Sequence, residues 1–181
     1  MKKIYLVLTS STAVFLLLGA GVAQSQIVSL SPSSVTTNQN SNFSISVNIN
    51  SVTNLFSTYF DLDFNSSLIS FVNATEGTFM SQGCQTSLMS AENPAGKLIV
   101  GLTRLGEPCG GVSGSGALMT LNFRALSQNG TSNMSFSNNG LTVYNSGTFS
   151  DIVGTWSGGN VTINQTTDTT PPGAPTGVTV F

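Results

Sequence analysis

Two aspartates in the segment STYFDLDFNSS (57–67) are the residues whose type and spacing suggest chemistry. On a β-strand, residues i and i+2 point to the same side, so the Cβ atoms of Asp61 and Asp63 would lie roughly 6.5–7 Å apart. That separation suits the acid and base of a glycosidase, and carboxylate oxygens also suit calcium. A third interpretation is that both aspartates are solvated residues on the outer side of a strand.

The surroundings of the two aspartates favour neither catalysis nor metal binding. A glycosidase pair flanks a cleft, and one of its carboxyl groups needs a raised pKa, but nothing in this segment supplies an apolar cleft. The sequence has no EF-hand-like loop and no histidine, which rules out a Ser-His-Asp triad. Cys84 and Cys109 alone would make a poor zinc site. We therefore expect no catalytic residues, no metal site and no cofactor.

The aspartates lie in a pattern that is typical of β-strands. Apolar and polar residues alternate in FSISVNI (43–49) and again in LFSTYFDLDF (55–64). The second segment places Tyr59, Asp61 and Asp63 on one side and an apolar set on the other, namely Phe56, Thr58, Phe60, Leu62 and Phe64. Further strands are predicted at 68–75, 97–105, 117–126, 134–138, 141–145 and 160–164, with turn signals between them. Because no window has a sustained helical period, the sequence predicts an all-β sandwich.

The two ends of the chain differ in composition from the middle. The start, MKKIYLVLTSSTAVFLLLGAGVAQSQ, is typical of a secretory signal peptide cleaved near Ala23 or Ser25. Polar residues at 9–12 interrupt its apolar run and argue against a retained membrane anchor. The last residues are rich in Thr and Pro, and PPGAPTGVTVF is similar to the start of a fibronectin type III domain. We predict a signal peptide at 1–25, an extracellular domain at 26–165 without a membrane span, and a linker or the truncated start of a further domain at 166–181.

Charge and cysteine content narrow the class of partner. Without Lys2 and Lys3, three of the five basic residues remain against seven acidic ones, a net charge of −4. Nucleic acid is therefore not an expected partner, since binding phosphates needs clustered Lys and Arg. Export makes a disulfide between Cys84 and Cys109 the expected state of the two cysteines.

The order of the strands resembles the cohesin family. The segment VSLSPSSVTTNQNSNFSISVNINSVTNLFSTYFDLDFNSSLISFVNAT (28–75) is similar to the start of that family's domain. GKLIVGLTRL, GSGALMTLNFRAL and GGNVTI resemble the later strands in the expected order. The resemblance implies a nine-stranded jelly-roll β-sandwich that is not an enzyme and that binds a dockerin-like module or another cell-surface protein. By this analogy Tyr59, Asp61 and Asp63 lie on the binding face, and a neighbouring strand adds Thr120, Asn122 and Arg124.

Carbohydrate binding is the alternative function from a different class. Sandwich domains that bind polysaccharide usually present a strip of flat aromatic side chains. Trp156 and Tyr144, together with Tyr59, are the candidates for such a strip, because they are the aromatic residues other than Phe that remain after the signal peptide. Exposure of Trp156 would favour a sugar site, whereas packing of Trp156 over an edge of the core would not.

Overall fold

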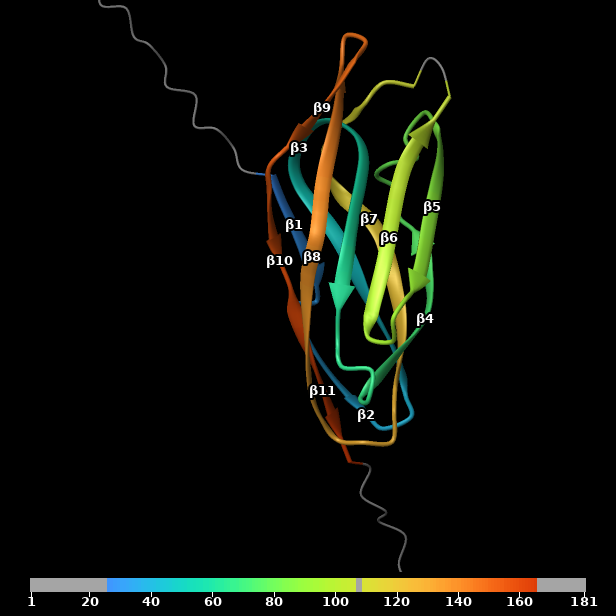
Figure 1. The fold of residues 1–181 in the computed structure, drawn as a ribbon, viewed down its shortest axis with the longest axis vertical. Helices are drawn as coiled ribbons and strands as arrows, with labels where there is room; N and C mark the ends of the chain where they lie inside the picture. The colour runs from blue at the N-terminus through green and yellow to red at the C-terminus, as the bar shows by residue number, and fades with distance from the viewer. Residues whose placement is uncertain (1–25, 107–108, 166–181) are drawn as a thin grey trace, which may run out of the picture.

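The computed structural model describes residues 26–106 and 109–165, and this part of the chain is built from strands without a helix. It therefore contains no candidate for a membrane-spanning helix. The predicted signal peptide and the predicted linker lie outside the described residues. Figure 1 shows an elongated sandwich of two sheets, in which the described chain begins on the upper left side, at β1, and ends at the bottom, after β11.

The front sheet is the layer nearer the viewer in Figure 1. Its neighbours, in spatial order, are β5, β6, the second half of β3, β8, and then β9 and β11, with β2 beside β11. The bounds of these strands are β2 Ser34–Asn38, β3 Asn42–Asp63, β5 Gln85–Glu92, β6 Lys97–Leu105, β8 Gly130–Asn145, β9 Thr148–Ile152 and β11 Gly159–Asn164.

The back sheet consists of β4, β7, the first half of β3, β1 and β10 in spatial order. Its additional strands are β1 Gln26–Ser31, β4 Ile69–Glu76, β7 Val112–Ala125 and β10 Gly154–Ser157. The all-β jelly-roll sandwich that the sequence predicts is therefore confirmed, with eleven strand segments in the described residues where the family resemblance implied nine strands.

Strand β3 belongs to both sheets. Residues 42–49 pair with β7 and 57–63 pair with β6 and β8. Between the two halves, Ser51 and Asn54 have φ angles of 58° and 55°, a conformation that few residues other than Gly adopt and that turns the strand from one layer to the other. The two strands predicted at 43–49 and 55–64 are thus one continuous element.

The core lies between the two sheets and follows the predicted alternation. Phe60 and Leu62 are fully buried from the front sheet, and Leu121 and Phe123 are fully buried from the back sheet. Phe123 contacts the rings of Phe43, Phe64 and Phe71 at centroid distances of 5.5–5.8 Å. Because burial of one such side chain contributes about 1.5–3 kcal/mol, these alternating positions hold the layers together.

Phe56, which the alternation places on the apolar side of the strand, is not fully buried. The register against β8 shifts between Leu55 and Ser57, so Leu55 is fully buried while Phe56 is not. Phe56 instead contacts Tyr144 and Phe149, whose ring centroids lie 5.7 and 4.9 Å from its own. A strict period of two cannot anticipate such a bulge, because the extra residue inverts the sides of the strand.

Two loops cross between the sheets at the same end of the sandwich, and the predicted disulfide joins them. The connection from β4 to β5 carries Cys84, the connection from β6 to β7 carries Cys109, and the two residues are bonded with their Cα atoms 5.8 Å apart. Arg104, only 5% exposed, donates hydrogen bonds to the carbonyl oxygens of Met80, Gln82 and Gly110. A covalent bond and a buried guanidinium therefore secure the same pair of loops.

Candidate functional site

The outer side of the front sheet is organised in rows that run across neighbouring strands. One row places Met89, Gly101, Tyr59 and Gly140 side by side, since these residues are paired in register. The next row contains Ala91, Ile99, Asp61 and Ser137. Lys97 and Asp63 follow in the third row. We call the surface formed by these three rows the front face.

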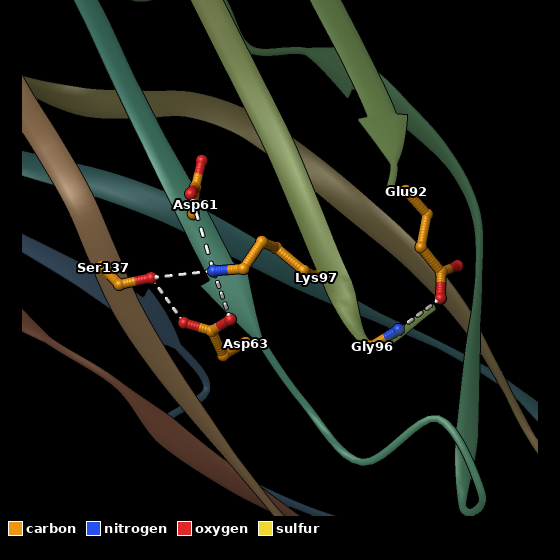
Figure 2. A network of polar contacts seen from close by, with 6 residues as sticks. All are labelled: Asp61, Asp63, Glu92, Gly96, Lys97 and Ser137. Atoms are coloured by element: carbon orange, nitrogen blue, oxygen red, sulfur yellow. Dashed lines mark hydrogen bonds and ion pairs between the residues drawn. The ribbon is translucent and has the colours of Figure 1, made fainter. Parts of the chain in front are cut away.

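Lys97 connects the two aspartates of the front face (Figure 2). Its Nζ lies 2.7 Å from Asp63 Oδ1 and 3.5 Å from Asp61 Oδ2. Ser137 on β8 donates its hydroxyl to Asp63 Oδ2 and accepts a hydrogen bond from Lys97 Nζ over 3.4 Å. The predicted strand position of the aspartates is correct, but a cation from the next strand covers them.

The hairpin between β5 and β6 explains why Lys97 reaches this position. Gly96 adopts a φ of 85°, its N–H donates to Glu92 Oε1 over 2.8 Å, and its carbonyl accepts from Phe64 N over 2.8 Å. A side chain at Gly96 would place its Cβ 2.7 Å from the carbonyl oxygen of Phe64. This glycine therefore allows the hairpin to close against the end of β3, beside Asp63.

The charges of this network oppose a catalytic role. The hydrogen bond from Lys97 is the main cause that lowers the pKa of Asp63, and Ser137 adds to it. The same contact with Asp63 raises the pKa of Lys97. A general acid at neutral pH needs the opposite shift, a raised carboxyl pKa. Within the described residues, no group of three or more His, Cys, Asp or Glu side chains could hold a metal ion.

Tyr59 stands at the centre of the front face between two glycines. Its ring lies over Gly140, where an added Cβ would come within 2.6 Å of the ring. On the other side, the space above Gly101 is open, with no heavy atom within 4 Å of an added Cβ. Tyr59 is 48% exposed, and Gly101, its partner on β6, lines a hollow.

That hollow lies over β5 and β6 and is largely apolar. It has a volume of about 600 Å³ and is lined by Leu88, Met89, Ser90, Ala91, Ile99, Val100 and Gly101. Met89 is 73% exposed and Ile99 is 43% exposed. Exposed large apolar side chains next to an ordered charge network are typical of a surface that binds a partner.

Three of the predicted partner-binding residues lie elsewhere. Thr120, Asn122 and Arg124 are on β7, which pairs with β4 and with the first half of β3, not with the half that carries Tyr59. Leu121 and Phe123 alternate with them and are fully buried, so these three residues lie on the outer side of the back sheet. The prediction that they share a face with Tyr59, Asp61 and Asp63 is therefore wrong.

The two aromatic residues proposed for a sugar site also do not form a strip. Trp156 packs against Phe60 and Phe136, with ring centroids 5.8 and 5.2 Å away, and so covers an edge of the core. Tyr144 lies 4.7 Å from Phe149 in a separate cluster near the β8–β9 turn.

Sequence reasoning missed Lys97, Met89, Ile99 and Gly101 as parts of the front face. Lys97 is the single lysine after the predicted signal peptide, and its rarity could have identified it as a candidate partner for the aspartates. Its pairing with Asp63 depends on the register between β6 and β3, which the local pattern does not determine.

Comparisons with known proteins agree with this architecture. A sequence model of the cohesin domain matches residues 28–163, more than half of the chain. A comparison with curated protein sequences found no significant match.

Several solved structures are similar to the fold. The seventh ScaB type I cohesin from Pseudobacteroides cellulosolvens is 11% identical, with a TM-score of 0.67 over 81% of this chain and 97% of that chain. The sixth cohesin of Acetivibrio cellulolyticus scaffoldin B, solved with a Cel5 dockerin mutant, is 18% identical, with a TM-score of 0.64 over 78% of this chain and 100% of that chain. A non-cellulosomal cohesin from Archaeoglobus fulgidus is 15% identical, with a TM-score of 0.61 over 78% of this chain and 92% of that chain.

These structures establish similarity of fold, and the sequence model establishes the family. The chain belongs to the cohesin family, whose domains are non-catalytic protein-binding modules.

Proposed function

We propose that the front face binds a dockerin-like module of another exported protein. The observation that carries this proposal is the combination of exposed apolar side chains with an ordered charge network on one side of one sheet. Tyr59, Met89 and Ile99 supply apolar area, and Asp61, Asp63 and Lys97 supply directed polar groups. Protein interfaces of this kind combine an apolar centre with a polar rim that determines orientation.

The charge balance of the network indicates the chemistry of the partner. Two carboxylates against one ammonium leave a net charge of −1 at this position. A partner that places a basic or hydroxyl side chain there gains a hydrogen bond, whereas an acidic side chain meets repulsion. The adjacent hollow at Gly101 accommodates an aliphatic side chain of the same partner.

The test is capture of exported proteins by the immobilised full chain, followed by mass spectrometry of what binds. The exported proteins come from the organism that encodes the chain, and we expect a protein that contains a dockerin-like module. Tyr59→Ala should weaken capture at least about tenfold, because central aromatic anchors contribute about 2 kcal/mol or more. Gly101→Arg should block the hollow with little effect on stability, since the space above Gly101 is open.

Thr120→Ala on the back sheet is the matched control and should bind as the unchanged chain does. The proposal fails if Tyr59→Ala and Gly101→Arg both remain folded and capture the partner normally. It also fails if Thr120→Ala removes binding, because that residue lies on the other layer.

Export by a signal peptide at 1–25, a module at 26–165 and a linker after it are part of the same proposal. The composition of the two ends of the chain supports it. Mass spectrometry of the protein recovered from culture medium should give an N-terminus near Ser25 or Gln26. Recovery of the intact chain with Met1 from the cell fraction would contradict it.

A further inference from the structure

The outer side of the back sheet has a surface chemistry different from that of the front face. Its rows contain hydroxyl and amide side chains: Asn73, Asn122 and Ser44 in one row, and Thr75, Thr120 and Ser46 in the next. Strand β1 continues the second row with Ser31. We call the surface formed by these two rows the back face. These rows contain no ionisable side chain, and Arg124 lies in the row beyond them.

The first of these rows is ordered by a chain of hydrogen bonds. Ser44 Oγ donates to Asn122 Oδ1 over 2.6 Å, and Asn122 Nδ2 donates to Asn73 Oδ1 over 2.7 Å. Each amide carries two donors and an acceptor with two lone pairs, and a hydroxyl carries two lone pairs. In this row Asn122 therefore retains one N–H donor, Asn73 retains two, and Ser44 retains acceptor capacity. Donors and acceptors alternate across the row in orientations set before any ligand binds.

A hollow of about 290 Å³ adjoins this row. Besides these three polar residues, it is lined by Asn42, Phe43, Val72 and Phe123. The register between β4 and β7 shifts at Val72, between Phe71 and Asn73, and Val72 is 52% exposed. Such a bulge redirects one side chain out of the regular pattern. The hollow thus combines an apolar wall with an ordered row of amides and a hydroxyl.

The chemistry of the hollow selects one class of ligand. A carboxylate or phosphate ligand would need a cation, and none of the residues that line the hollow is charged. A protein partner would need a larger exposed apolar centre than Val72 provides. A sugar ring presents hydroxyls that both donate and accept, together with C–H faces that pack on apolar groups. We propose that this hollow binds a neutral sugar unit of a polysaccharide, independently of the front face.

The experiment is native affinity electrophoresis of the full chain in gels that contain hydroxyethylcellulose, xylan, galactomannan or a soluble β-1,3-glucan. We expect retardation by at least one of these neutral polysaccharides and none by the acidic polysaccharide alginate. Asn73→Ala and Asn122→Leu should each raise the dissociation constant about five- to tenfold, the effect of losing one or two neutral hydrogen bonds. Asn73 is exposed, so Asn73→Ala keeps the test valid if Asn122→Leu fails to fold.

Two control variants separate this site from other surfaces. Tyr59→Ala, on the front face, should retain full retardation, so that failure of the front-face proposal leaves this result unaffected. Phe149→Ala, in the aromatic cluster with Tyr144, should also retain it. The inference is overturned if none of the four neutral polysaccharides retards the chain. It is equally overturned if Phe149→Ala abolishes retardation while Asn73→Ala leaves it unchanged.

Discussion

Lys97 holds two carboxylates at once, and the shorter of its two contacts is with Asp63. Because the folded-state pKa of Asp63 is lowered, ionised Asp63 stabilises the fold above its unfolded pKa. That contribution is lost as the pH falls through the folded-state pKa. The carboxylate is 38% exposed, so solvent screens the pair and limits its contribution to about 1 kcal/mol at most.

Asp63→Asn should therefore lower the free energy of unfolding by at most about 1 kcal/mol at neutral pH. The difference between the two proteins should shrink as the pH falls below the unfolded-state pKa of Asp63 and through its lowered folded-state pKa. Urea unfolding across this pH range measures it. A difference that stays constant with pH would show that the substitution acts through packing and not through charge.

Arg104 is a second charged residue that we expect to contribute to stability. Unlike Asp63, it is almost fully buried. Desolvation lowers its pKa, and three backbone carbonyls accept its N–H groups in place of a carboxylate. Arg104→Ala should cost about 3 kcal/mol of stability, because hydrogen bonds from a charged donor contribute about 1.5–3 kcal/mol each and part of the loss is recovered by water.

Arg104→Lys should rescue little, since a single ammonium cannot reproduce the planar fork. Thermal and urea unfolding measure both variants, with exposed Arg124→Ala as a control expected within about 0.5 kcal/mol of the unchanged chain. Equal effects of Arg104→Ala and Arg124→Ala would contradict the role assigned to Arg104.

At the scale of elements, the bend in β3 decides which residues share a surface. The bend is packed tightly against the residue that precedes β7, because an added Cβ at Gly111 would lie 2.1 Å from the carbonyl oxygen of Asn54. Gly110, next to it, has no heavy atom within 4 Å of such a Cβ. The two neighbouring glycines therefore offer a matched pair of substitutions.

Gly111→Ala should destabilise the fold by about 1–3 kcal/mol, the usual cost of forcing atoms into packed space. Gly110→Ala should be nearly neutral. Differential scanning calorimetry of the two variants checks the difference. Similar melting temperatures of the two variants would contradict this prediction. They would show that the close approach of β3 to Gly111 does not contribute to the stability of the fold.

At the scale of the whole molecule, the disulfide between Cys84 and Cys109 joins the β4–β5 connection to the β6–β7 connection. The sequence separation is 25 residues. Restricting the unfolded chain over a loop of this length stabilises the folded state by about 3.5 kcal/mol on the chain-entropy argument. Since Arg104 also holds these two loops together, we expect the sandwich to remain folded when the disulfide is reduced, with a lower free energy of unfolding.

Reduction should lower the free energy of unfolding by about 3 kcal/mol and leave the strand signal in circular dichroism intact. A Cys84→Ser, Cys109→Ser double variant should match the reduced protein and no longer respond to the reductant. A reductant effect that persists in the double variant would exclude the disulfide as its cause.

Individual residues show which features of the fold the local sequence pattern predicts and which it does not. Alternation correctly predicted that Phe60 and Leu62 are buried and that Asp61 and Asp63 face outward, because side chains on a strand alternate by geometry alone. It failed at Phe56, where a register shift inverts the sides. It also failed to place β7, because nothing local tells which half of β3 a distant strand will pair with.

The sequence by itself determined the class of fold, the side of each regular strand that is buried, and the pairing of the two cysteines. Those properties depend on periodicity and composition within short segments. Only the tertiary structure decided that Lys97 lies between Asp61 and Asp63, and that Asn122 lies on the opposite sheet from Tyr59. The physical reason is that strand register, and the bend that sends β3 through both sheets, are set by contacts between residues far apart in the chain.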